Sequence, residues 1–455
     1  MSLSPLKVVR SGLCIGCGSC AGQTDQTEAV IDFDKHGKLR PYGTDEWFKA
    51  PSETLERTCP FSPKARNEDE LAQELFPQAR KHNTAGRFTK AYVGHVAEEE
   101  FRRRGSSGGM TSWVLEELMK KGKIDAAIHV APSSSPDRYY EYTVSCSPEE
   151  IRKGARSRYY PVDLSEALRT IRRVPARYAI VGVPCFIKAI QLLRREDPIL
   201  RERIVHTLGL FCGHMKSATF VESLALQMDV LPSKVKQPDF RIKDETRSAS
   251  TYTAELTLKD HTTRKRDWWN LVDGDWGSGF WQYEACNYCD DVIAETADIS
   301  FGDAWVEPYS SDGKGTNVVV VRSPELETLL EEAIQEGRLS LKEVDEDFVV
   351  ETQAAGFRQR REGLGYRLTW LRTRLKPLRP RKRVKPQRPD SLRRRVIYRT
   401  RAWITRGSHR IFRFARALRT PRLFLGWGKA ATAFYHGFAY SRGRLGALLD
   451  RWSVK

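Results

Sequence analysis

Four cysteines near the N-terminus have the spacing of an iron–sulfur site. Cys14, Cys17 and Cys20 recur at every third residue, and Cys59 follows after 38 further residues, directly before Pro60. A cubane cluster needs four thiolates at tetrahedral corners, and a loop with a cysteine at every third residue can wrap around three of them. A fourth cysteine before a proline is a recurrent feature of proteins that hold such clusters. The spacing therefore predicts a [4Fe–4S] cluster.

Structural zinc is the alternative, because zinc is also held by four cysteines. Zinc ligands usually come as two CxxC pairs, so the compact triple favours iron–sulfur. Small residues such as Gly16 and Gly18 would let backbone amides approach the sulfides of a cluster. With zinc bound instead, the chain would be a non-enzymatic protein whose basic tail binds an acidic surface or nucleic acid.

Four more cysteines lie at the ends of expected strands or just before one. Carboxyl ends of parallel strands converge on one crevice, so these cysteines could meet as ligands of a second cluster. Their spacing alone does not establish this, because single cysteines are more often inert buried residues. They are Cys185, Cys212, Cys286 and Cys289, the last two forming a CxxC pair.

A loop rich in glycine and serine, residues 105–110, directly precedes an expected helix. Glycines allow close approach of the backbone, and free amides at a helix start attract anions. The loop suits the phosphate groups of a nucleotide or flavin, although the same residues also make an ordinary helix cap. It is neither a P-loop nor a GxGxxG motif.

The middle of the chain alternates apolar strand runs with helical patterns. This alternation predicts an α/β class with a partly parallel sheet and some α+β elements. Alternating apolar residues at 254–258 predict a half-buried strand in a hairpin. The expected strands are 91–97, 124–131, 178–183, 204–211, 297–305 and 317–322, and the expected helices are 111–121, 185–195 and 217–228.

The pattern divides the chain into three parts. Residues 1–65 form a small ferredoxin-like cysteine-rich module, a polar helix and loop at 66–86 links it onward, and residues 88–350 form a mixed α/β body. Residues 371–455 form a basic extension that begins with a linker rich in proline and arginine. The last 105 residues hold 29 Lys and Arg but only 4 Asp and Glu, so the net charge of +18 belongs to this end.

The extension has three interpretations. A disordered or loosely helical solvated segment is the default for such a charge run. The second interpretation is an amphipathic helix on an anionic membrane, which arginines interleaved with aromatic residues suit. The third is nucleic-acid binding, and we favour the membrane over it. No secretory signal or 18-residue apolar stretch is present, and the clustered cysteines indicate a reducing compartment. We therefore expect a cytoplasmic protein with peripheral contact at the inner face of the membrane.

Five motifs, in this order along residues 10–325, resemble the family of coenzyme F420 hydrogenase/dehydrogenase beta subunits. These iron–sulfur flavoproteins include relatives of 7-hydroxymethyl chlorophyll a reductase. The motifs are CxxCxxC with a distant CP at 14–60, GSSGGM at 105–110, SRYYPV at 157–162, VGVPCF with GLFCGH at 181–186 and 209–214, and CNYC with ADISFGDAW at 286–289 and 297–305.

The resemblance implies two [4Fe–4S] clusters and a flavin, FAD or FMN, with both cysteine sets complete. One departure is Glu284, where relatives often carry a basic residue. The implied flavin contacts are Ser106, Ser107, Gly108, Gly109, Ser157, Arg158 and Tyr159.

The expected activity is an oxidoreductase that passes electrons between ferredoxin or coenzyme F420 and a small-molecule substrate. His214 and Asp303 are candidate proton donors near the second cysteine group. Both have simpler interpretations, His214 as a satisfied loop histidine and Asp303 as a cap or turn residue.

Overall fold

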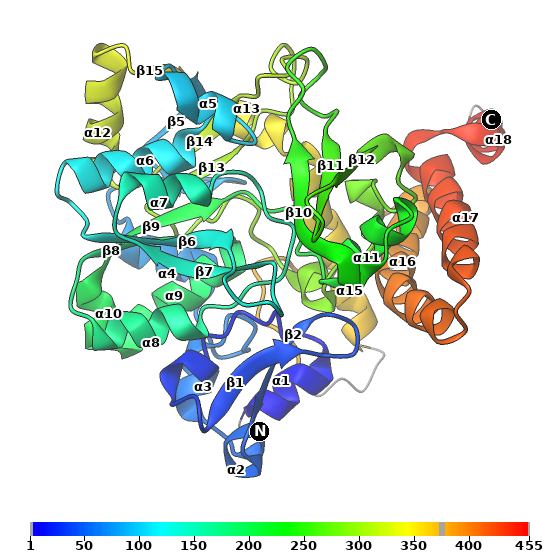
Figure 1. Ribbon diagram of the computed structural model, residues 1–455, viewed down its shortest axis with the longest axis horizontal. Coiled ribbons are helices and arrows are strands. Elements are labelled where there is room, and N and C mark those ends of the chain that lie inside the picture. The colour runs from blue at the N-terminus through cyan, green and yellow to red at the C-terminus, as the bar shows by residue number, and fades with distance from the viewer. Residues whose placement is uncertain (1–2, 373–377, 454–455) are drawn as a thin grey trace.

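The computed structural model describes residues 3–372 and 378–453 and centres on an eight-stranded sheet (Figure 1). The strand order is β15-β5-β14-β13-β9-β8-β6-β7, with β13, β9, β8 and β6 parallel and the flanking pairs antiparallel. The expected mixed α/β class is thus confirmed. The strands are β5 Lys90–Val96, β6 Ala126–Pro132, β7 Tyr140–Ser145, β8 Tyr178–Gly182, β9 Ile204–Leu210, β13 Ile299–Asp303, β14 Asn317–Val321 and β15 Leu339–Val344.

Helices cover both faces of this sheet, which explains why its central strands are apolar throughout. On β8, Val181 packs in one core with helices α6 and α12, whereas Ile180 belongs to the core on the opposite face with α9. Every residue of β8 and β14 is buried. The helices are α6 Met110–Lys120, α9 Pro184–Glu196, α11 Thr219–Gln227 and α12 Pro324–Gln335.

The expected strands and helices of the body are confirmed to within a few residues. The edge strands β7 and β15 were not expected, because their side chains are largely polar and half-exposed. The expected hairpin is part of a three-stranded antiparallel sheet of β10 Val235–Ile242, β11 Thr253–Leu258 and β12 Thr263–Asp267.

The N-terminal unit packs below the sheet in the view of Figure 1. Its cysteine loop lies between helix α1 and strand β1, and Cys59 caps the end of α3. The backbone amide of Leu39 donates to the hydroxyl of Tyr283 at 2.7 Å, which ties this unit to the second cysteine segment. The elements are α1 Pro5–Ser11, β1 Ala29–Phe33, β2 Leu39–Gly43, α2 Asp45–Lys49 and α3 Glu53–Thr58, with α4 Glu68–Leu75 in the linking segment.

The chain beyond residue 350 departs from expectation. Helices α16 and α17 lie side by side and pack on the body (Figure 1), where the Trp281 ring contacts Phe412 at 5.2 Å and Phe424 at 5.1 Å between centroids. A loosely ordered, solvated extension is therefore wrong for these two helices, because their apolar residues form a core. The helices are α13 Glu346–Thr352, α14 Ala354–Arg360, α15 Glu362–Arg372, α16 Leu392–Ala417, α17 Pro421–Tyr440 and α18 Gly443–Ser453.

Residues 373–377 of the expected linker and residues 454–455 of the extension lie outside the described residues. Within the described ranges, none of the helices combines the length and apolar character needed to cross a membrane. Peripheral membrane contact stays a prediction, for which Trp403 and Phe414, each at least half exposed, are the available side chains.

Replacing Phe424 with alanine tests whether the extension is part of the core. Phe424 is fully buried, so Phe424→Ala should lower the free energy of unfolding by about 3–5 kcal/mol, measured by denaturant unfolding. Phe434→Ala on the same helix is the control, because Phe434 is 44% exposed. Equal stability of the two variants would show that the extension does not pack on the body.

Candidate functional site

The first four cysteines line one apolar pocket in the N-terminal unit. Leu13, Ile15, Leu55 and Phe61 are among the other residues of this pocket. Gly16 and Gly18 adopt φ angles of 71° and 79°, which only glycine takes without strain, and these turns bend the loop around the pocket. The cysteines of the pocket are Cys14, Cys17, Cys20 and Cys59.

Three thiols of this pocket, those of Cys17, Cys20 and Cys59, resist ionisation. Burial raises the pKa of Cys17 to about 11 and that of Cys59 to about 12. Burial also raises the pKa of Cys20, and the neighbouring Cys17, Cys14 and Cys59 raise it further. Four thiolates can persist here only beside bound positive charge, which the irons of a cluster would supply.

The second four cysteines also come together. Cys185 and Cys212 follow the adjacent parallel strands β8 and β9, and the CxxC pair lies on a short 3₁₀ turn beside them. Burial raises the pKa of Cys185, and Cys289, Cys212 and Cys286 raise it further. The convergence expected at the strand ends is therefore present. Cys17 also contributes to this shift, so the two cysteine groups are neighbours.

A buried arginine lies against the second cysteine group. Arg360 of α14 donates from Nη2 to the carbonyl of Cys212 at 2.7 Å and from Nε to the carbonyl of Asp291 at 2.8 Å. Burial alone would lower the pKa of this guanidinium, but Cys289, Cys212 and Cys286 outweigh it and raise the pKa. Arg360 thus provides a fixed cation beside three of the four thiols.

In the part of the chain that the structure describes, no three His, Cys, Asp or Glu side chains converge as ligands of a single metal ion.

A cavity of about 920 Å³ lies beside the second cysteine group. Cys212 lines it, as do residues from the glycine- and serine-rich loop and from the segment 157–160. The Oγ of Ser106 accepts a hydrogen bond from the amide of Ser157 at 2.8 Å, which joins these two segments. Gly109, with φ of 87°, precedes α6. The amide of Met110 donates to Oδ1 of Asn317 at 3.2 Å, and the next two residues of the first turn, Thr111 and Ser112, line the cavity.

The expected flavin contacts largely surround this cavity. Ser106, Ser107, Gly109, Ser157, Arg158 and Tyr159 line it, whereas Gly108 packs behind the loop against Gly94 and Asn317. Arg158 donates to the carbonyl of Ala155 at 2.8 Å, but its buried Nε has no hydrogen-bond partner among the described residues. Tyr159 lies against Trp276, with ring centroids 4.6 Å apart.

His214 lies on the same cavity, two residues after Cys212. Its Nδ1 is 3.4 Å from Nη2 of Arg401, and a guanidinium can only donate, so Nδ1 accepts and Nε2 carries the proton. That Nε2 is buried without a hydrogen-bond partner among the described residues. Burial, then the charges of Lys216, Arg401 and Arg360, hold the pKa of His214 well below its usual value. The ring is therefore a neutral hydrogen-bond donor.

Asp303 also lines the cavity, at the end of β13. Both of its carboxylate oxygens accept from Arg241, with two N–O distances of 2.9 Å. Arg241 is itself buried, and Tyr252 and Trp305 lie against its guanidinium. The pair fixes Asp303 in place, and its role as a proton donor stays a prediction.

Comparison with known proteins places these features in a family. Residues 91–169 match the model for the N-terminal part of the coenzyme F420 hydrogenase/dehydrogenase beta subunit, and residues 176–347 match the model for its C-terminal part. The two matches cover more than half of the chain. The chain belongs to the family of coenzyme F420 hydrogenase/dehydrogenase beta subunits.

Individual members of this family are distant from the chain. It is 24% identical to a subunit of the F420H2 dehydrogenase of Methanosarcina mazei, over 65% of this chain and 77% of that protein. It is 22% identical to the coenzyme F420-dependent sulfite reductase of Methanocaldococcus jannaschii, over 74% of this chain and about half (49%) of that enzyme. A chain of the F420-reducing [NiFe] hydrogenase complex from Methanosarcina barkeri matches with 17% identity and a TM-score of 0.48, over 64% of this chain and 96% of its own.

Membership makes the chain an oxidoreductase. Two residues that the sequence did not reveal, Arg360 and Arg401, lie beyond residue 347, where the family match ends. Single arginines within a basic segment give no spacing signal, so only their contacts with Cys212 and His214 identify them. Arg241 was also missed, because a single arginine gives no spacing signal.

Asp303→Asn tests whether the ion pair between Asp303 and Arg241 stabilises the site. The change leaves the buried Arg241 without a carboxylate, and we expect the free energy of unfolding to fall by about 2–3 kcal/mol, below the range for fully buried pairs because Asp303 is 22% exposed. Denaturant unfolding measures this. The control is Asp125→Asn, in a pair whose side chains are 45% and 49% exposed, with an expected loss under about 1 kcal/mol. Unchanged stability in Asp303→Asn would mean that the pair does not hold the site together.

Proposed function

We propose that the chain is an iron–sulfur flavoprotein oxidoreductase that holds two [4Fe–4S] clusters and one flavin. The observation that carries this proposal is the single cavity on which Cys212, the loop of Ser106 and Ser107, and His214 all lie. A redox cofactor in that cavity would lie beside the second cysteine group, whose neighbour is the first.

The donor sets suit these groups. Cys14, Cys17, Cys20 and Cys59 would hold the first cluster, and Cys185, Cys212, Cys286 and Cys289 the second. The zinc alternative is disfavoured, because the compact CxxCxxC triple differs from the paired CxxC spacing of zinc sites and the chain is an oxidoreductase by family.

The flavin would bind with its phosphate groups toward the start of α6 and toward Arg158. The amides of Thr111 and Ser112 in the first turn of α6 and the unpartnered Nε of Arg158 could donate to an anionic phosphate. The aromatic wall of Tyr159, Trp268 and Trp276 would pack against its apolar rings. FAD is preferred to FMN because the cavity volume of about 920 Å³ is at the upper end for ligand sites.

When bound, the clusters would supply one-electron transfer and the flavin would couple it to two-electron chemistry. The residues of the chain bind and orient. His214 would donate from Nε2 to an acceptor atom of the ligand in the cavity, and Arg401 keeps that proton on Nε2. Arg360 would stabilise negative charge on the second cysteine group, which favours its reduced state.

Coenzyme F420 or ferredoxin is the proposed redox partner. The relatives that match over most of this chain are an F420H2 dehydrogenase subunit and an F420-dependent sulfite reductase, and both names refer to this coenzyme. A small-molecule substrate would bind in the cavity beside the flavin, where residues 213–215 and 274–277 form part of the lining.

Iron analysis of the anaerobically purified protein tests the cluster assignment. The wild type should be brown, with absorbance that bleaches on reduction, and should release a yellow flavin. Cys286→Ser should lose about half of the iron, because one of two equal clusters loses a ligand. Cys146→Ser is the control, since Cys146 is exposed and outside both groups. Colourless protein with stoichiometric zinc would refute the proposal, and full iron in Cys286→Ser would refute the second ligand set.

Arg401→Lys tests the role given to His214. Lysine keeps the positive charge, but it cannot reproduce the hydrogen bonds that the Arg401 guanidinium makes to Gly277, Gln282 and His214 at the same time. We expect kcat for oxidation of reduced F420 with a dye acceptor to fall roughly tenfold or more, and KM to change little. Arg399→Lys, two residues away on the exposed side of α16, should retain wild-type kcat. A wild-type kcat in Arg401→Lys would remove the positioning role.

A further inference from the structure

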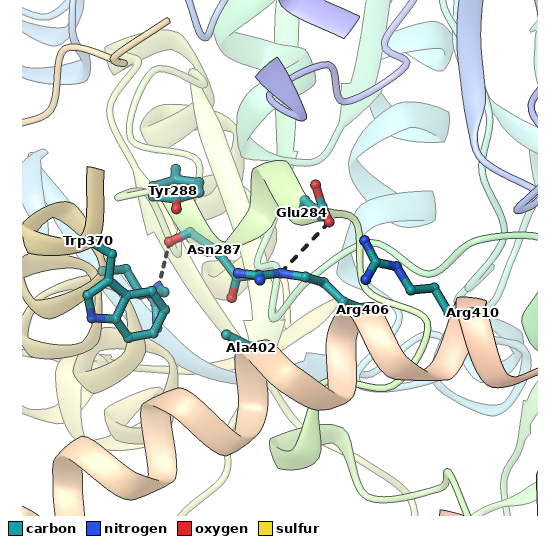
Figure 2. A pocket seen from close by; sticks show the side chains of 8 residues that line it. Glu284, Asn287, Tyr288, Trp370, Ala402, Arg406 and Arg410 are labelled. Carbon is teal, nitrogen blue, oxygen red and sulfur yellow. Dashed lines mark hydrogen bonds and ion pairs between the residues drawn. The ribbon is translucent and has the colours of Figure 1, made fainter. Parts of the chain in front are cut away.

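A second cavity, of about 450 Å³, lies between the N-terminal unit and helix α16. Lys38 and Arg40 come from the β1–β2 hairpin, Arg10 from the end of α1, and Arg406 and Arg410 from α16. Figure 2 shows Arg406 and Arg410 on one face of α16, in the adjoining pocket that shares this wall. None of these residues falls within the family matches, which cover 91–169 and 176–347.

Lys38 is the unusual residue of this cavity. Its side chain is buried, with 6% exposure, yet its ammonium forms no hydrogen bond or ion pair with any of the described residues. Burial, then the charge of Arg40, lowers the pKa of Lys38 to about 8. Lys38 lines the cavity, and the carboxylates of Glu284 and Asp34 only partly offset the cost of burying its charge. An acceptor from outside the chain, bound in the cavity, would lower this cost further.

The carboxylates of the cavity are already engaged. Asp34 pairs with Arg40 at 3.3 Å, and Glu284 lies 4.0 Å from Nε of Arg406 (Figure 2). Arg10 and Arg410 form no ion pair within residues 3–372 and 378–453 and are exposed at the rim. With Lys38, three positive charges remain uncompensated.

A second polar group also lacks a partner. The Nδ1 of His36 is buried on the same cavity and has no hydrogen-bond partner among the described residues. Lys38 and His36 therefore lie on the cavity wall with unused hydrogen-bonding capacity, beneath a rim of arginines. Glu284 is offset by Arg406.

We infer that this cavity binds a small molecule with two or more phosphate or carboxylate groups. One anionic group lies on Lys38 and His36 in the interior, and another pairs with Arg10 and Arg410 at the rim. The volume is within the range of small-molecule sites, and the buried position of Lys38 suits a compact anion better than a protein surface.

The site also lies against both cysteine groups. Arg40 donates to the carbonyl of Cys14, and Glu284, which lines the cavity, precedes Cys286 by two residues. A bound anion would add negative charge near both groups and so lower their reduction potentials. This redox consequence rests on the proposed clusters, whereas the binding itself does not.

The test is calorimetric titration of the full-length holoprotein, with flavin and iron bound, with inorganic pyrophosphate and separately with citrate. We expect one saturable site per chain. Lys38→Gln and Arg410→Gln should each weaken binding roughly tenfold or more, because each removes a charge-assisted contact. The two variants lie on different segments, so a folding defect in one leaves the other informative.

Lys35→Gln is the matched control, because Lys35 is an exposed lysine of the same hairpin that does not line the cavity, and its affinity should be unchanged. In the absence of ligand, Lys38→Gln should not lower Tm, since it removes an uncompensated buried charge.

Absence of saturable binding, or equal binding by Lys38→Gln and the wild type, overturns the proposal. Binding of an acidic ferredoxin that depends on Lys38, with no binding of either small anion, would overturn it in favour of a protein-docking site. Iron content measured in the same samples keeps a failure of the cluster assignment distinct from a failure of this site.

Discussion

The gathering of eight cysteines in two neighbouring groups is the constraint on which the rest of this structure depends. Burial raises the pKa of six of these thiols, those of Cys17, Cys20, Cys59, Cys185, Cys212 and Cys286, so their thiolate forms need positive charge beside them. Arg360 is a buried side-chain cation that lies against the second group. Parallel pairing of β8 and β9 sets the positions of Cys185 and Cys212, and the bond from Leu39 to Tyr283 fixes the N-terminal unit against them.

Sequence reasoning succeeded where the signal is local. The buried strands β8 and β14 are uninterrupted apolar runs. The spacing of Cys14, Cys17 and Cys20 directly predicts a loop that brings the three side chains together. It failed at the edge strands β7 and β15. Strand β7 alternates Tyr140, Tyr142 and Val144 with polar residues and pairs with the preceding strand β6, so its local signal was overlooked. Strand β15 loses its alternation at Lys342 and Glu343 and pairs with the distant β5, so tertiary pairing defines it.

The C-terminal segment shows why charge counting misled. Its arginines were taken as a solvated run, yet several are buried and donate to backbone carbonyls rather than to acids. Arg367 bonds the carbonyls of Asn287 and Gln359, Arg360 that of Cys212, and Arg401 that of Gly277. A guanidinium has five donors and can satisfy carbonyls at the ends of turns that no helix or strand pairs. The amino-acid composition shows the number of positive charges, but it does not show which arginines are buried and donate to backbone carbonyls.

These arginines also explain how one segment serves both cavities. Helix α16 contributes Arg401 and Arg394 to the large cavity and Arg406 and Arg410 to the basic one. With 3.6 residues per turn, Arg401 and Arg406 point in different directions, so a single rigid helix forms a wall of each. The same helix therefore holds Arg401 beside His214 on one side and Arg406 near Glu284 on the other. Because α16 lies beyond residue 347, where the family match ends, the family models do not describe this shared wall.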